Sequence, residues 1–359
     1  MRNVKLFFLI FIINIVFINT ANTQIEETNP AAGGASRISP DTLYKDYIEQ
    51  GLYYFEKNQL NQAKYLFYNA KELMPDRADS YINLAAIAMK RKNFAKAIII
   101  LEKAGKLPDE TKQDVIFCNL GMCLQKLSKY PEAINYYSKA ISINPVLGEA
   151  LLNRGMLYLK NDKTDLALID ILKARVIFRE QGRKDIVRSC DEMLFPITKK
   201  YAEDKNLAEK LLREGSLSFE NKRNEEAIAL LKVSILLGPD NQEGYYRLGV
   251  VYTNSKKFDE ALDCFSKTIK LNPENVSAYM NMGAIFGELK KYDQALSALH
   301  KALNLEKNNP KIYYNIAMVH ISNANKKEAA SYLKKAKALA AKKRDPRLLQ
   351  RIDEAYKTL

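Results

Sequence analysis

Residues 242–275 read QEGYYRLGVVYTNSKKFDEALDCFSKTIKLNPEN, and this 34-residue stretch decides the fold. Its apolar residues recur at helical spacing in two segments of about 14 residues, which predicts two amphipathic helices. The polar turn Ser255–Lys257 separates the two segments. Gly249 occupies the eighth position and Ala261 the twentieth, so a very small residue lies in each helix. Pro273 is expected to end the second helix, because proline cannot continue one.

The same pattern fills most of the chain as eight copies of a 34-residue frame. The frame needs a two-residue shift before the third copy and a 26-residue insertion before the fifth. The copies begin at Tyr44, Ala78, Asp114, Gly148, Ala208, Gln242, Val276 and Pro310. The eighth position is always tiny: Gly51, Ala85, Gly121, Gly155, Gly215, Gly249, Gly283 and Ala317. The twentieth is always alanine: Ala63, Ala97, Ala133, Ala167, Ala227, Ala261, Ala295 and Ala329.

The small positions have a steric reason. Two helices of one repeat can cross closely only where glycine or alanine lets the backbones approach. Large apolar residues recur at the fourth and twenty-fourth positions, for example Tyr245 and Phe265, and supply the contact area around the small ones. The frame therefore predicts paired helices that stack on one another along the chain.

This order of bulky, small, aromatic, alanine, aromatic and proline positions resembles the tetratricopeptide repeat family over residues 44–343, apart from the insertion. The resemblance implies an all-α fold, a right-handed α-solenoid of stacked helix-turn-helix repeats. It also implies that the first helix of each repeat lines a concave face, where family members bind extended peptides or partner helices. Repeats four and eight depart from the pattern, with Arg179 and Ala341 where proline is usual.

The flanking segments complete the predicted organisation. Arg2 and Lys5 precede an apolar run that ends at Ile18, which is typical of a secretory signal peptide; an uncleaved membrane anchor is the alternative. Pro196 is expected to kink or end a helix in the insertion, which is read as a connecting helix, either rigid or a hinge. The predicted segments are signal peptide 1–23, flexible linker 24–43, repeats one to four 44–181, connecting helix 182–207, repeats five to eight 208–343, and C-terminal capping helix 344–359.

Composition disfavours several functions. The 359 residues include two His and four Cys, too few for a metal site or a disulfide framework, so no metal and no cofactor is expected. Cys118, Cys123, Cys190 and Cys264 are interpreted as small buried hydrophobes. His300 and His320 fall in different repeats, each expected at a helix surface or in the groove. No catalytic motif appears, and an exported chain without a nucleic-acid module is not expected to bind nucleic acid.

The sixth position of the frame supplies the candidate binding residues. It holds Glu49, Asn83, Asn119, Asn153, Arg213, Arg247, Asn281 and Asn315. An Asn amide can pair with both the donor and the acceptor of a peptide backbone, so these residues predict a ladder that holds an extended partner. The arrangement resembles the asparagine ladder of O-linked N-acetylglucosamine transferases; the alternative is a local helix contact. Arg213 and Arg247 would clamp a carboxylate, or pair with nearby acids such as Glu209, Glu214 and Glu243.

A second candidate surface is basic. The chain carries a formal charge of +14, and residues 326–351 are dense in Lys and Arg. Lys334, Lys335, Lys342 and Lys343 would bind an anionic envelope surface, or form a solvated face. The sequence thus predicts a non-enzymatic, exported (periplasmic or secreted) protein-interaction scaffold that binds a peptide or helix in its groove. The alternatives are a tether to an anionic surface and a regulatory subunit of an envelope enzyme.

Overall fold

The computed structural model describes residues 39–108 and 110–359, and all regular structure in these ranges is helical. The predicted signal peptide and most of the predicted linker lie outside the described residues. The chain divides into two compact units, one ending at Leu194 and the other spanning Phe195–Leu359.

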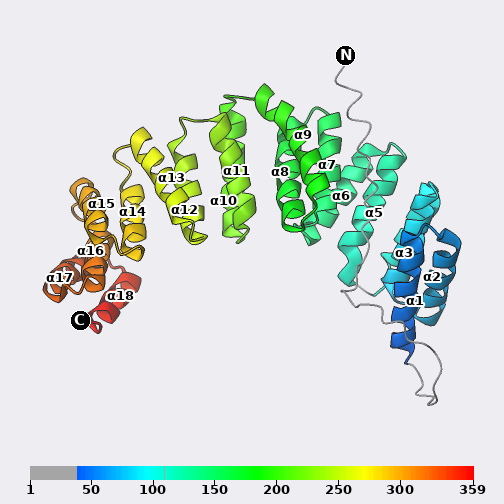
Figure 1. Cartoon of the computed structure of the whole chain (residues 1–359), viewed down its shortest axis with the longest axis horizontal. Helices are drawn as coiled ribbons and strands as arrows, with labels where there is room; N and C mark the ends of the chain where they lie inside the picture. Colours follow the sequence, from blue (N-terminus) through cyan, green and yellow to red (C-terminus); the bar gives the residue numbers. More distant parts are fainter. Residues whose placement is uncertain (1–38, 109) are drawn as a thin grey trace. The chain divides into compact units, whose positions relative to one another are not determined.

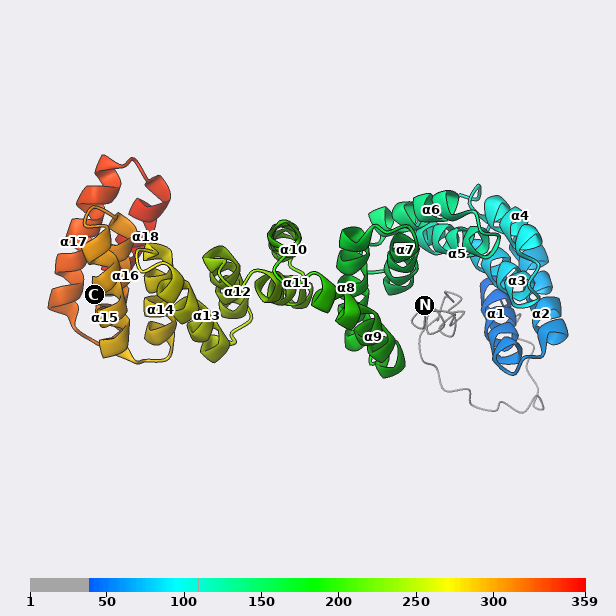
Figure 2. The same ribbon diagram turned by 90° about the horizontal axis from the view of Figure 1, so that it is seen from above.

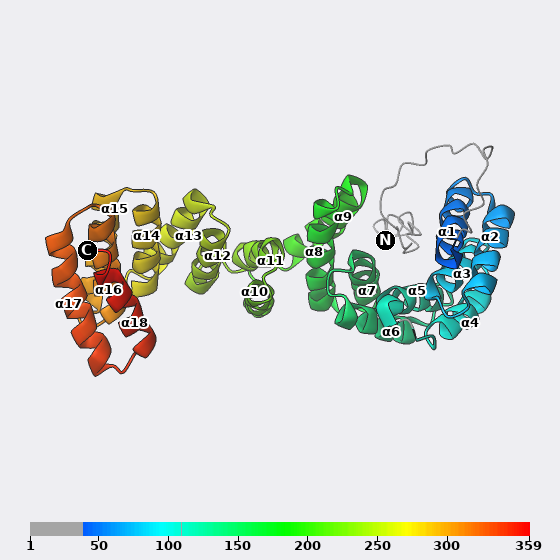
Figure 3. The same cartoon turned by 90° about the horizontal axis from the view of Figure 1, so that it is seen from below.

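Unit 1 contains four helical hairpins, and its helices run as follows: α1 (Pro40–Glu56), α2 (Leu60–Leu73), α3 (Ala78–Lys90), α4 (Phe94–Ala104), the 3₁₀ helix η2 (Glu110–Lys112), α5 (Gln113–Lys126), α6 (Tyr130–Ile143), α7 (Gly148–Lys160) and α8 (Thr164–Glu180). Helix α9 (Lys184–Lys200) contains the boundary between the units. Within unit 1 the first helix of each hairpin lies on the inner side of a curved row and the second on the outer side (Figures 2 and 3).

Unit 2 contains four further hairpins and one added helix: α10 (Lys205–Glu220), α11 (Asn224–Leu237), α12 (Gln242–Asn254), α13 (Phe258–Leu271), α14 (Val276–Glu288), α15 (Tyr292–Leu305), α16 (Pro310–Ser322), α17 (Lys326–Lys342) and α18 (Pro346–Tyr356). Helix α18 lies against the last hairpin (Figure 1) and buries Leu348, Ile352 and Ala355 in a cluster with residues of α16 and α17. It therefore packs its apolar side against the last repeat.

The predicted close approach inside each hairpin is confirmed by the glycines. A Cβ atom added at Gly283 would lie 2.6 Å from Cγ of Leu299, and one at Gly121 would lie 2.8 Å from the ring of Tyr137. In both cases the clash joins the eighth position to the twenty-fourth. The alanines of the twentieth position are all completely buried: Ala63, Ala97, Ala133, Ala167, Ala227, Ala261, Ala295 and Ala329.

The turn inside each hairpin has a regular backbone conformation that the sequence pattern does not reveal. The fifteenth residue of every repeat has a left-handed backbone with φ between 55° and 61°, yet none is glycine: Asn58, Lys92, Ser128, Asp162, Lys222, Lys256, Lys290 and Ala324. The next residue donates its backbone N–H to the carbonyl five positions back, as Lys257 does to Tyr252 at 2.9 Å. This Schellman pairing offsets the cost of a left-handed side-chain-bearing residue, which is about 1 kcal/mol.

The start of the first helix differs from the prediction. The linker was expected to reach residue 43, but α1 begins at Pro40, because the Ser39 hydroxyl caps the helix by accepting from the Thr42 N–H at 3.2 Å and Pro40 suits the first turn. Of the two effects expected of Pro196, a kink or an end, the structure excludes the end, because α9 continues through Pro196 to Lys200. The prediction that the cysteines are buried is confirmed for all four, and burial raises the pKa of the Cys123 thiol to about 12.

No helix within residues 39–108 or 110–359 combines the length and apolar character needed to cross a membrane.

Two glycines one turn apart in α14 test the packing rule. We expect Gly283→Ala to destabilise unit 2 by about 1–3 kcal/mol, because the new methyl group overpacks against Leu299. Gly287→Ala is the matched control, since its Cβ would meet only Val319 Cγ2 at 3.6 Å, and we expect it to stabilise by up to about 1 kcal/mol through helix propensity. Urea unfolding followed by circular dichroism measures both; equal shifts would refute the rule.

Candidate functional site

The asparagines of the sixth position lie on the first helices of their hairpins, as the frame predicts. Asn83 (α3) and Asn119 (α5) are 0% and 1% exposed, whereas Asn153 (α7) and, in unit 2, Asn315 (α16) are half-buried. Among the described residues, neither amide atom of Asn83 or Asn119 has a hydrogen-bond partner. Asn153 and Asn315 likewise make no hydrogen bond within the described part of the chain.

These unpaired amides bear on the two interpretations of the asparagines, a binding ladder and a local helix contact. A local helix contact would require a partner nearby, and of the five asparagines only Asn281 has one within the described residues, the Tyr246 hydroxyl at 3.5 Å. That distance is the outer limit of a hydrogen bond. A buried amide without a partner costs about 1–3 kcal/mol, so a purely structural role would favour an apolar residue at these positions. Half-buried Asn153 and Asn315 are therefore open to a ligand, whereas Asn83 and Asn119 are closed off from solvent in this structure.

The two arginines of the sixth position behave differently. Arg213 lies 3.8 Å from Glu209, and Arg247 lies 2.7 Å from Glu243, each one turn back on the same helix. Both pairs are exposed, and such pairs contribute at most about 1 kcal/mol. The structure thus shows the local pairing that was the alternative to a carboxylate clamp.

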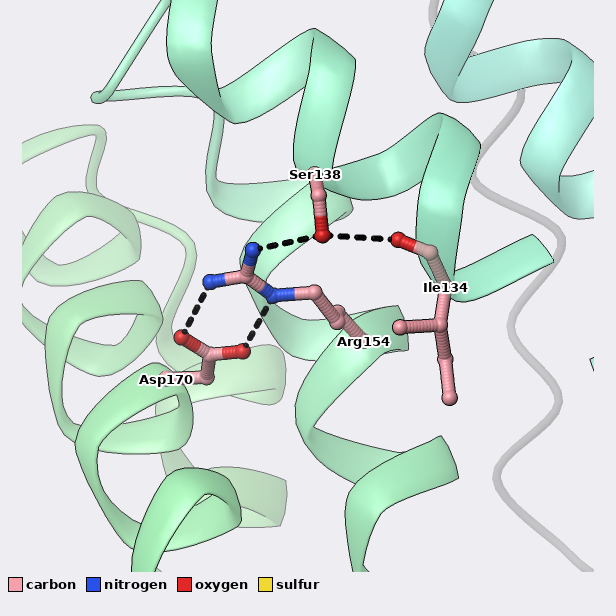
Figure 4. Close-up of polar contacts among 4 residues, drawn as sticks. All are labelled: Ile134, Ser138, Arg154 and Asp170. Carbon is pink, nitrogen blue, oxygen red and sulfur yellow. Dashed lines mark hydrogen bonds and ion pairs between the residues drawn. The ribbon is translucent and has the colours of Figure 1, made fainter. Parts of the chain in front are cut away.

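A polar network that the repeat pattern did not predict joins three helices of unit 1. Figure 4 shows the Arg154 guanidinium of α7 held between Asp170 of α8 and Ser138 of α6. Its Nε and one terminal nitrogen donate to the two Asp170 oxygens at 2.7 and 2.9 Å, and the other nitrogen donates to the Ser138 hydroxyl at 2.9 Å. Ser138 in turn donates to the carbonyl of Ile134 at 2.8 Å. This is a bidentate ion pair, and the hydrogen bond to Ser138 adds a third contact to the guanidinium.

Because it is largely buried, this ion pair helps to hold α7 and α8 together. The Asp170 side chain is 5% exposed. Burial alone would lower the pKa of Arg154, but the hydrogen bonds and charge of Asp170 outweigh it, and that pKa rises above its usual value. A signal for the pair exists in the sequence: Arg154 and Asp170 are charged at the seventh and twenty-third positions, the second of which is uncharged in every other repeat.

Breaking the Arg154–Asp170 pair on one side is expected to be costly. We predict that Asp170→Ala destabilises unit 1 by about 3–5 kcal/mol, because it leaves a mostly buried guanidinium without its counter-ion. The double variant Arg154→Leu/Asp170→Leu is expected to recover most of this loss. Urea unfolding of the single and double variants tests the point, and additive losses would contradict it.

An aromatic cluster in unit 2 brings together the two histidines, which the sequence placed in separate surroundings. The Tyr332 ring of α17 stacks on His320 of α16 at 5.5 Å and 17°, and its centroid is 6.4 Å from that of His300 of α15. His320 is 9% exposed, and its Nδ1 atom has no hydrogen-bond partner among the described residues. Burial lowers the pKa of His320 below 6.5; nearby Glu328 opposes this shift and His300 adds to it.

The lowered pKa of His320 predicts a pH-dependent stability. The folded state prefers neutral imidazole, so this contribution is present above pH 6.5 and is lost as the pH falls below that value toward the lower folded pKa. We expect the melting temperature to fall between pH 7.5 and 5, and to fall less in His320→Phe, which keeps the stacked ring without titrating. Parallel pH profiles for the two chains would contradict the assignment.

The candidate basic residues are open to solvent. Lys334, Lys335, Lys342 and Lys343 are all exposed, and none forms an ion pair with an acid of the described residues. Lys335 lies over the Tyr332 ring at 5.7 Å. Nearby Lys337 differs, because it pairs with Asp353 of α18 at 2.6 Å. Within residues 39–108 and 110–359 no cluster of His, Cys, Asp and Glu has the arrangement of a metal site.

Comparison with known proteins agrees with the fold. Tetratricopeptide repeat families match residues 78–108, 115–145, 243–275 and 288–359, which coincide with hairpins of the structure. A human protein named protein O-mannosyl-transferase TMTC3 is 24% identical over 221 residues, covering 50% of this chain. The chain spans 24% of the length of that curated relative.

Two solved structures show similar helical arrays. One is the APC/C hetero-tetramer Cut9–Hcn1 (19% identity, TM-score 0.36, covering 82% of this chain and 52% of that one). The other is a tetratricopeptide repeat protein from Parabacteroides merdae (15% identity, TM-score 0.33, covering 87% and 98%). From the family matches and the repeated hairpins, the chain is a tetratricopeptide repeat protein.

Proposed function

We propose that the chain is a non-enzymatic scaffold that holds an extended segment of a partner protein against the first helices of its repeats. The observation that carries this proposal is the pair of half-buried asparagine amides without partners in the described chain, Asn153 in unit 1 and Asn315 in unit 2. Each amide has a donor nitrogen and an acceptor oxygen, so it can pair with both the C=O and the N–H groups of an extended backbone. Such contacts bind the main chain whatever the side chains are.

The apolar surroundings of these amides support a protein partner. Met156 lies three residues after Asn153 on α7, Met318 lies three residues after Asn315 on α16, and both methionines are half-buried. A hydrogen bond formed in such surroundings is protected from water and is correspondingly strong. Methionine adapts its shape, so this face suits partners of varied side chains.

We place this scaffold in the cell envelope. The support is the N-terminal sequence, in which Arg2 and Lys5 precede an apolar run as in secretory signals. The exposed Lys334, Lys335, Lys342 and Lys343, free of acid partners in the described chain, favour one second candidate, a tether to an anionic envelope surface.

Replacing the ladder asparagines should have separate effects on stability and on peptide binding, which purely structural asparagines would not give. We predict that Asn83→Leu/Asn119→Leu raises the stability of unit 1 by about 1–3 kcal/mol, because it removes unpaired buried polar groups. Asn153→Leu/Asn315→Leu, which removes the amides that a ligand can reach, should weaken the binding of linear peptides selected from a random display library on the wild-type chain by about tenfold or more. Calorimetry measures the first effect and fluorescence anisotropy the second.

Two controls sharpen the result. Asn135→Leu, on the exposed side of α6, should change neither stability nor binding. Selected peptides carrying N-methyl groups on alternate residues should lose affinity, because their backbone donors are gone. Loss of stability with unchanged peptide binding would remove the ladder, and binding to anionic vesicles that needs the four lysines would favour the tether.

A further inference from the structure

A pocket of about 630 Å³ opens in unit 2 where α14, α16 and α18 meet. Its walls include Asn315 of the sixth position, Tyr314 beside it, and Arg351 of the added helix α18. Gly287 of α14 contributes a bare stretch of backbone: a Cβ atom there would meet only Val319, at 3.6 Å. The pocket is therefore open toward ligand along α14.

Arg351 is held in place without being neutralised. Its guanidinium carbon lies 4.8 Å from the centroid of the Tyr314 ring, within the range of a cation–π contact. No carboxylate of the described residues pairs with it. Stacking fixes the flat face of the guanidinium and leaves its N–H edges available, so the fork that matches a carboxylate is preorganised.

The other charged groups of the pocket do not cancel this cation. Lys290 and Glu288 also line it, so Arg351 leaves one net positive charge. The Asn315 amide in the same wall makes no hydrogen bond within the described chain. One cavity thus contains the Asn315 amide, which can bind a peptide backbone, and the Arg351 guanidinium, which can bind a carboxylate.

We propose that this pocket binds a carboxylate of the extended partner segment, with Arg351 as its anchor and Asn315 holding the adjacent backbone. The inference rests on the proposed function and adds the chemistry of the partner. A carboxylate on a peptide comes from an Asp or Glu side chain or from the C-terminus, and both present the same two oxygens to the arginine fork. The anchor comes from α18, outside the repeats, so it gives the groove a selectivity that the repeated positions lack.

The test compares random linear peptides selected by display on the full wild-type chain and on variants. On the wild type we expect enrichment of Asp, Glu or a free C-terminal carboxylate. Arg351→Gln should abolish that enrichment, and Gly287→Leu, which fills the pocket without changing its charge, should do the same. Arg347→Gln, an exposed arginine one turn earlier on α18, is the matched control and should leave the enrichment unchanged.

Individual peptides then identify the source of the carboxylate. Glu→Gln, Asp→Asn or C-terminal amidation in a selected peptide should weaken binding to the wild type by about tenfold, and binding to Arg351→Gln by less than about twofold. Circular dichroism and melting curves confirm that each variant is folded; if Gly287→Leu is not, Arg351→Gln alone decides.

The outcomes separate the two proposals. Peptides selected without an acidic preference would overturn the carboxylate pocket and leave the scaffold intact. An acidic preference that responds equally to Arg347→Gln and Arg351→Gln would also overturn it, because general attraction to a chain of charge +14 would then suffice. If no peptide is selected at all, the scaffold proposal fails and the pocket fails with it.

Discussion

The contact between a glycine or alanine of one helix and a large side chain of its partner carries the rest of the structure. At Gly51 the Phe67 ring lies where a side chain would begin, with only 2.4 Å to a Cβ atom added there. This approach fixes which side of the first helix faces its partner. The sixth position, two residues earlier, is therefore turned away from that contact by about 200°, toward the inner side of the row. Close packing inside the hairpin thus sets the position of the amide ladder.

The hairpins were predictable because their cause is local and repeats at a fixed spacing. Gly283 and Leu299 are sixteen residues apart in one repeat, so their contact leaves a periodic trace. The left-handed turns left no such trace, since Lys92 and Lys256 adopt φ near 59° and 56° although lysine has no preference for that region. The early start of α1 depended on the Ser39 cap, which a frame counted from Tyr44 omits.

The positions of the candidate site residues were predictable from the sequence, but their pairing partners were not. The pairing of Arg247 with Glu243 lies within one helix turn, so the sequence contains it as an alternative. The lack of any partner for Asn83 depends on every neighbouring helix at once, which no local pattern encodes. The stacking of Arg351 on Tyr314 joins a residue outside the repeats to one inside them, so the period does not predict it either.

Repeated contacts leave the register of a bound partner, that is, which partner residue lies at which repeat, poorly determined. Where neighbouring repeats carry the same amide, a partner displaced by one repeat would form similar hydrogen bonds with nearly the same binding energy. Discrimination between registers is a difference of affinities, so it requires a group that occurs once. In unit 2, Arg351 is such a group, because α18 is not part of the repeated frame. A carboxylate placed at Arg351 would give one register a charge-assisted pair that every shifted register lacks. On this proposal the repeats would supply general affinity for a backbone, and the added helix α18 would select the sequence that binds.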